Sequence, residues 1–107
     1  MVFQTGAALL DAIVLAIVSK EEEGTYGYKI TQEVRSAIEV SESTLYPVLR
    51  RLQKSQCLEV HDVECAGRNR RYYQITNTGR ERLDMYRNEW MEYSSKINLL
   101  FLREEIV

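Results

Sequence analysis

Residues 43–52 read Ser-Thr-Leu-Tyr-Pro-Val-Leu-Arg-Arg-Leu, and this stretch predicts an α-helix with one apolar face. Their apolar members share the spacing of one α-helical face: Leu45, Val48, Leu49 and Leu52. The opposite face offers hydroxyls, a ring and cations: Ser43, Tyr46, Pro47, Arg50 and, just beyond, Lys54. A short helix that packs by leucines and displays such a face fits the major groove of DNA.

The start of this helix has two candidates, because Ser41 and Ser43 are both good N-cap residues. Pro47 has no amide hydrogen and would remove a helical hydrogen bond if the helix began at Ser41. We therefore favour a start at Ser43. The preceding helix is expected to begin at Thr25 as its N-cap and to bury Ile30, Val34 and Ile38, which makes the pair a helix-turn-helix.

The run from Ala7 to Val18 is apolar at eleven of twelve positions. A helix of this composition has no solvated face, so we expect a second subunit to cover the side that carries Leu9 and Ile13. The run is interrupted by Asp11 and is too short to span a bilayer. It also lacks the basic leader and cleavage pattern of a secretory signal.

A β-hairpin is expected after residue 55. The first strand runs from Cys57 to Cys65, with a bulge between Val60 and Val63 where the alternation slips. Residues 66–69 form the turn and residues 70–75 the returning strand, in which one of two adjacent tyrosines faces the core. A helix-turn-helix followed by such a hairpin is a winged helix, whose wing arginines reach phosphates or the minor groove.

The last segment carries an a/d heptad seam. Its apolar residues are separated by 3, 4, 3, 4 and 3 positions: Leu83, Tyr86, Trp90, Tyr93, Ile97 and Leu100. A helix of about 27 residues would be roughly 40 Å long, more than one small domain requires. It could lie across its own domain, but we favour a dimer interface. The prediction is a mainly α chain, with a winged helix-turn-helix over 1–75 and a dimerisation helix over 76–107.

Charge is unevenly distributed along the 107 residues, whose net charge is −2. Residues 43–82 contain eight cations and four anions, a net charge of +4, and the remainder has six cations and twelve anions, a net charge of −6. This is either an ordinary charged surface or a local phosphate-binding surface on an acidic body. The length suits a single domain.

The two cysteines do not indicate a disulfide framework. On one extended strand Cys57 and Cys65 would lie roughly 26 Å apart, and His61 between them is too far from either for a shared metal. Free thiols favour a reducing, cytoplasmic setting over a redox sensor. The sequence has no Gly-rich phosphate loop, metal-ligand cluster or nucleophile elbow, so we expect neither an enzyme nor a cofactor.

Several short motifs, in order, resemble the PadR-type transcriptional repressors. They are Tyr26-Gly27-Tyr28 with Ile30, then residues 43–47 with Leu49, Arg51 and Leu52, then Gly67-Arg68 with residues 70–73, and finally Thr76 with Gly79. The resemblance covers almost the whole chain. The single long C-terminal helix is similar to the short-chain branch of that family.

The resemblance implies a homodimeric repressor that binds an inverted repeat in double-stranded promoter DNA and is released by a small hydrophobic or aromatic effector. Trp90, with Tyr93, would contact the effector, although a tryptophan here is equally a residue of the interface core. Arg51 is expected to form an intramolecular ion pair. The alternative function is a dimeric protein-interaction module that does not read DNA. The expected DNA-binding residues are Ser43, Thr44, Tyr46, Pro47, Arg50, Lys54, Arg68, Arg70 and Arg71.

Overall fold

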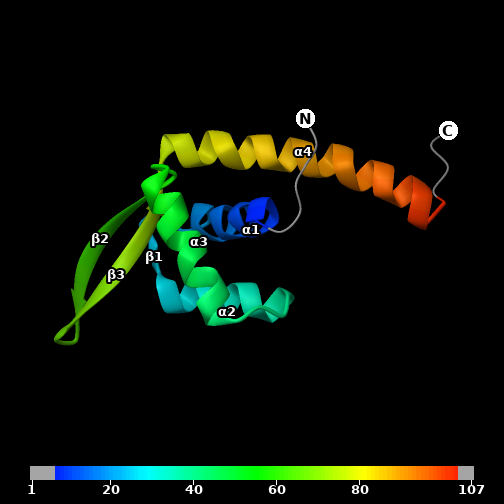
Figure 1. The fold of residues 1–107 in the computed structure, drawn as a ribbon. Helices are drawn as coiled ribbons and strands as arrows, with labels where there is room; N and C mark the ends of the chain where they lie inside the picture. The colour runs from blue at the N-terminus through cyan, green and yellow to red at the C-terminus, as the bar shows by residue number, and fades with distance from the viewer. Residues whose placement is uncertain (1–6, 104–107) are drawn as a thin grey trace.

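The computed structural model describes residues 7–103. It has four helices and one antiparallel sheet of three strands in the order β1-β3-β2. The elements are α1 (Ala7–Ser19), β1 (Thr25–Tyr26), α2 (Gly27–Ala37), α3 (Glu42–Lys54), β2 (Leu58–Cys65), β3 (Arg68–Ile75) and α4 (Asn77–Phe101). This is the winged helix-turn-helix that the sequence predicted, with the long α4 running along one side of it (Figure 1).

The core lies where α1, α2 and α3 meet the base of the sheet. α1 contributes Val14, Leu15 and Val18, all fully buried, and the leucines of residues 45–52 close over them from α3. The expected helical face of α3 is therefore confirmed. Because α1 packs against α2, α3 and α4, it is the central helix of the domain.

α3 begins earlier than predicted, since Glu42 is already helical and Ser41 is the N-cap. The Ser41 hydroxyl accepts a hydrogen bond from the Thr44 amide at 3.3 Å, and the Leu45 amide donates to the Ser41 carbonyl at 3.3 Å. Pro47 lies inside the helix but on its exposed side. Water can therefore satisfy the carbonyl that Pro47 leaves without a donor, which is why the cap at Ser41 is favoured over one at Ser43.

The end of α3 is joined tightly to the start of α4. Gln56 has a φ of +63°, and the Cys57 amide donates to the Leu52 carbonyl at 2.9 Å, which is a Schellman-type ending with glutamine in the left-handed position. Thr76, the N-cap of α4, donates from its hydroxyl to the Gln56 carbonyl at 2.6 Å and from its amide to the Cys57 carbonyl at 3.0 Å. We call this junction the α3–α4 corner.

Gly79 allows this corner to close. A methyl group at Gly79 would overlap the carbonyl oxygen of Cys57 and come within 2.8 Å of Cγ1 of Ile75. The Gly79 amide also donates to the Thr76 hydroxyl at 3.0 Å. Glycine is needed at this position because the backbone of another segment occupies the space that a side chain would take.

The hairpin differs from the prediction in two respects. β2 and β3 pair one to one from Leu58↔Ile75 to Cys65↔Arg68, so there is no bulge. The turn is only Ala66-Gly67, with φ of +52° and +78°, which suits a two-residue hairpin. Val63 occupies the face opposite Leu58 and Val60, and its position interrupts the apolar alternation without an inserted residue.

A third strand was not anticipated. Thr25 and Tyr26 pair with Tyr73 and Tyr72 of β3, and Thr25 is therefore a strand residue rather than the cap of α2. Tyr26 holds the N-cap position of α2 without a side-chain capping bond. The strand anchors the start of α2 to the wing, which is important for the site described below.

An ion pair links α1 to α3. Asp11 is 7% exposed, and its carboxylate accepts a hydrogen bond from the Arg51 guanidinium. This confirms the intramolecular pair expected for Arg51. In residues 7–103 no helix is both long and apolar enough to cross a membrane. The same part of the chain brings together no group of three histidine, cysteine or acidic residues able to hold a metal ion.

Candidate nucleic-acid interface

A pocket lies between α2, α3 and the wing, and we call it the wing pocket. It has a volume of about 570 Å³ and is lined by Tyr26, Gly27, Tyr28, Tyr46, Arg50, Arg68, Asn69, Arg70, Arg71 and Tyr73. Five of the predicted DNA-binding residues are therefore brought together: Tyr46, Arg50, Arg68, Arg70 and Arg71. No acidic side chain belongs to this lining, so within the described chain the wing pocket is a cationic and aromatic surface.

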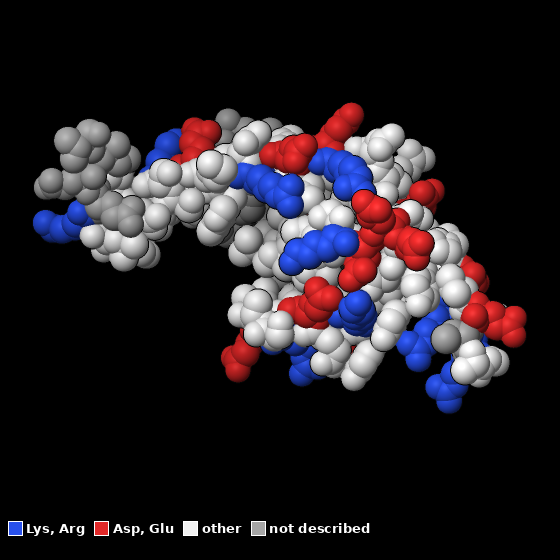
Figure 2. Space-filling model, turned by 180° about the vertical axis from the view of Figure 1, so that it is seen from behind, with Lys and Arg blue, Asp and Glu red and all other residues white. Residues whose placement is uncertain are grey.

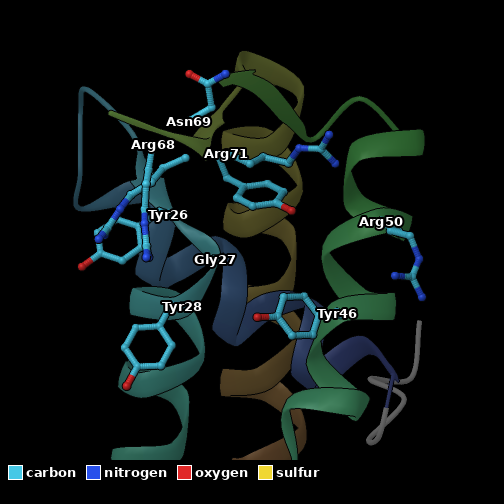
Figure 3. A pocket seen from close by; sticks show the side chains of 10 residues that line it. Tyr26, Gly27, Tyr28, Tyr46, Arg50, Arg68, Asn69 and Arg71 are labelled. Carbon is cyan, nitrogen blue, oxygen red and sulfur yellow. The ribbon is translucent and has the colours of Figure 1, made fainter. Parts of the chain in front are cut away.

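Figure 3 shows how these side chains are directed. The Tyr46 hydroxyl points from α3 toward α2, and Arg71 extends from the wing toward α3. Arg50 is on the lining, but its guanidinium extends to the outer side of α3, away from Tyr26 and Tyr28. The pocket floor is thus tyrosine, with cations from the wing at its upper edge and Arg50 at its outer border.

The other predicted DNA-binding residues lie outside the wing pocket. Ser43, Thr44 and Pro47 are exposed in the first two turns of α3. The Ser43 and Thr44 hydroxyls each lie 2.9 Å from the Ser41 hydroxyl, within hydrogen-bonding distance of the N-cap side chain. Lys54 lines a second hollow, of about 560 Å³, with Arg50, Arg51 and Gln53.

Two tyrosines that line the pocket were not among the residues that the sequence pointed to for the site. Tyr26 and Tyr28 were noted only as part of a family motif, yet they stand on the pocket wall opposite α3, and Tyr28 is 58% exposed. Their role depends on β1, which places Tyr26 opposite Tyr72 of the wing. A two-residue strand has too little pattern for periodicity to detect.

The surface seen from behind has a different character. Figure 2 shows acidic and basic side chains interspersed over the body on that side, with basic side chains also around the hairpin. Interspersed charges give no extended field of one sign, unlike a lining of arginines without carboxylates. The wing pocket is therefore the better candidate for binding a polyanion.

A second candidate surface lies between α1 and α4, and we call it the α1–α4 groove. It has a volume of about 210 Å³ and is lined by Leu9, Ala12, Ile13, Ala16, Leu83, Tyr86, Arg87 and Trp90. Five of the expected interface residues meet here: Leu9, Ile13, Leu83, Tyr86 and Trp90. Burial raises the pKa of Tyr86, and the nearby charge of Asp11 raises it further.

Leu83 does not fit the expected interface as the others do. It is 3% exposed and belongs to the core of its own chain, because α4 rests on α1 at this level. Tyr93 and Ile97 are half-buried, and Leu100 is 75% exposed. Trp90 is 43% exposed, and its ring centroid lies 6.3 Å from that of Tyr93. The two residues expected to contact the effector are therefore adjacent, and Trp90 lines the groove.

Comparison with known proteins gives consistent matches. Residues 14–85 match the sequence model of the transcriptional regulator PadR-like family. An uncharacterised protein of Lysinibacillus sphaericus is 35% identical over 96 residues, which cover 84% of this chain and 85% of that protein.

Solved structures agree with this over nearly the full length. The protein smu.1704 of Streptococcus mutans UA159 is 36% identical with a TM-score of 0.84, covering 100% of this chain and 98% of that one. A PadR-like transcriptional regulator of Bacillus cereus ATCC 14579 is 33% identical with a TM-score of 0.78, covering 91% and 94%. A PadR family transcription regulator of Clostridium difficile R20291 is 29% identical with a TM-score of 0.75, covering 87% and 97%.

Proposed function

The chain belongs to the PadR-like family of transcriptional regulators, and we propose that it acts as a homodimeric repressor released by a small aromatic effector. The family assignment makes it a DNA-binding regulator and not an enzyme. The operator is an inverted repeat, because a two-fold dimer presents two identical recognition helices. Repression follows from occupancy of the promoter by the dimer.

One observation carries the proposal, the convergence of α3 and the wing on a single cationic pocket. Arg68, Arg70 and Arg71 come from β3 and Tyr46 from α3, and among residues 7–103 no carboxylate lines the space between them. Arginine forks bind phosphate oxygens with two parallel hydrogen bonds, and tyrosine hydroxyls also donate to phosphates. We assign the wing pocket to the DNA backbone at the border of the major groove.

Base reading is assigned to the first turns of α3. Ser43, Thr44 and Pro47 are exposed there, and the N-terminal residues of a recognition helix are those that reach base edges. The Ser43 and Thr44 hydroxyls each make one hydrogen bond to the Ser41 hydroxyl. A hydroxyl has one donor and two acceptor positions, so each can also bond to a base. Lys54, near the end of α3, is assigned to a phosphate farther along the groove.

Dimerisation is supported by the outer part of α4. Leu100 and Phe101 are 75% and 79% exposed, and α4 projects past the rest of the body (Figure 1). Two large apolar side chains left in water at the end of a helix favour burial against a second copy. An effector is supported by the α1–α4 groove, whose apolar walls end at Trp90. A planar aromatic bound there would alter how the two copies meet.

The DNA-binding proposal is tested by a gel shift on the protein's own promoter at several salt concentrations. We expect Lys54→Ala and Arg68→Ala to weaken binding to every sequence alike and to reduce the salt dependence by about one released ion per contact. Ser43→Ala should instead reduce the ratio of the affinity for the operator to the affinity for scrambled DNA. Absence of binding by the wild type at low salt would contradict the proposal.

The effector proposal is tested by titrating planar aromatic compounds while following fluorescence, since Trp90 is the single tryptophan of the chain. We expect saturable quenching together with loss of the gel shift. Quenching without release of DNA would show a pocket that does not act as a switch. Trp90→Phe keeps an apolar ring in the groove but removes the fluorescence signal, so this variant is followed by gel shift alone, which shows whether the indole itself is required for release.

A further inference from the structure

Arg70 is stacked on Tyr26 in the wall of the wing pocket. The Arg70 Cζ lies 4.6 Å from the centroid of the Tyr26 ring. A guanidinium within about 6 Å of an aromatic ring centroid is attracted to the ring face. Because Arg70 belongs to β3 and Tyr26 to β1, this contact joins the wing directly to the start of α2.

The Tyr26 ring is itself held by its neighbours across the sheet. Tyr26 is paired with Tyr72, and Tyr72 is paired with His61 on the other side. The ring centroids lie 5.8 Å apart for Tyr26 and Tyr72 and 6.0 Å apart for Tyr72 and His61. Tilted aromatic pairs at such distances are favourable. Arg70 therefore rests on the end of a row of three rings that spans all three strands.

The cross-strand neighbours of the wing arginines differ in charge. The cross-strand neighbour of Arg70 is Val63, whereas the cross-strand neighbour of Arg71 is Asp62. Within residues 7–103 the structure gives Arg70 no carboxylate partner. Stacking occupies one face of the planar guanidinium and leaves its N–H edges available, and these edges are what bind a phosphate.

We propose that Tyr26 is a positioning residue that holds Arg70 ready for one backbone phosphate of the operator. This inference rests on the proposed DNA-binding function and adds a residue that touches no base. An exposed arginine loses side-chain freedom when it binds, and a stacked one has already lost part of it. Tyr26 thus contributes to affinity by removing part of the ordering cost from the binding step.

The experiment measures operator affinity against salt for the full chain and four variants. Arg70→Gln should reduce the slope of log affinity against log salt concentration by about one, because one phosphate contact is lost. Tyr26→Met fills similar space without a ring, and we expect about three- to tenfold weaker binding with the salt dependence of wild type. Tyr26→Phe keeps the ring face and should bind as wild type does.

The double variant Tyr26→Met/Arg70→Gln decides whether Tyr26 acts through Arg70. We expect it to bind no more weakly than Arg70→Gln alone, because the position of a missing arginine has no effect. Additive losses, or a Tyr26→Phe as weak as Tyr26→Met, would overturn the inference. Failure of the wild type to bind at all would instead contradict the proposed function.

A measurement on the wild type without DNA covers the case in which Tyr26→Met does not fold. Nitrogen relaxation of the arginine Nε–H groups compares Arg70 with Arg68, which lies next to the hairpin turn. We expect the Arg70 group to be markedly more ordered than the Arg68 group. Equal mobility of the two side chains would show that the stack does not hold Arg70 and would overturn the inference.

Discussion

The two halves of α4 carry one apolar repeat but have different surroundings. In the first half, Leu83 is 3% exposed and Tyr86 is half-buried, because both rest on α1. In the second half, Leu100 and Phe101 are 75% and 79% exposed, beyond the reach of α1 (Figure 1). The comparison teaches that a heptad pattern alone does not say which chain covers it. The first half stabilises the domain, and the second half is where we propose that a second copy binds.

The largest effect is expected from truncating the covered half. Leu83→Ala should lower the free energy of unfolding by about 2–5 kcal/mol, because it leaves a cavity in a packed core. Denaturant titration monitored by circular dichroism measures the loss. Met85→Ala, two residues along on an exposed position, is the matched control and should cost much less. Similar losses for both would mean that the first half is not packed as described.

A smaller loss is expected at the start of α4. Replacing glycine by alanine in a helix ordinarily stabilises it, by up to about 1 kcal/mol. At Gly79 the sign should reverse to a loss of about 1–3 kcal/mol, since the methyl would overlap the Cys57 carbonyl and Ile75. Thermal unfolding of Gly79→Ala beside Thr78→Ala, an exposed neighbour, checks this. Stabilisation by Gly79→Ala would show that the corner is looser than the structure has it.

The open half should respond differently. Leu100→Glu with Phe101→Glu should leave the helix content unchanged but weaken self-association by at least about tenfold, because charged groups replace apolar surface at the proposed interface. Analytical ultracentrifugation measures the dissociation constant. Ser95→Glu places a charge on an exposed polar position of the same helix and should associate nearly as wild type does. An unchanged dimer in the double variant would move the interface elsewhere.

The smallest effect is a dependence on pH at the border between the two halves. Burial and then the charge of Asp11 raise the pKa of Tyr86 above its usual 10.0. Between the pKa of Tyr86 in the unfolded chain and its higher pKa in the folded chain, the unfolded chain loses the tyrosine proton first. The contribution of Tyr86 to the free energy of unfolding is therefore fully present below pH 10 and is lost as the pH rises above it. The free energy of unfolding of wild type and of Tyr86→Phe, measured by denaturant titration from below to above pH 10, should fall less with pH in the variant.

Much of the fold follows from local pattern. The helical face of residues 45–52, the hairpin and the heptad seam are each a repeat of apolar residues with turn residues on either side. The start of α3 was placed too late because two serines compete for one cap. That competition is decided by the exposure of Pro47, a tertiary property that the sequence does not express.

The site was less predictable than the fold. The arginines of residues 68–71 were identified from composition, but the opposite wall of the wing pocket was not. Tyr26 reaches that wall only because β1 pairs with β3. Tyr26 is paired with Tyr72, 46 positions later, and Thr25 with Tyr73. The bulge was also predicted wrongly. Val63 is partly buried on the sheet face opposite Leu58 and Val60, so the apolar pattern changes face although the pairing stays one to one.

The α3–α4 corner has a mechanical consequence. α4 has 25 residues, and at 1.5 Å per residue it is roughly 37 Å long, with its exposed apolar end farthest from the corner. Thr76 and Gly79 clamp its near end to the segment that follows α3. The helix is thus a lever with a fixed fulcrum, and a tilt of about 5° at one end corresponds to roughly 3 Å at the other. A pair of such levers would convert a small change of angle between subunits into loss of register with successive major grooves.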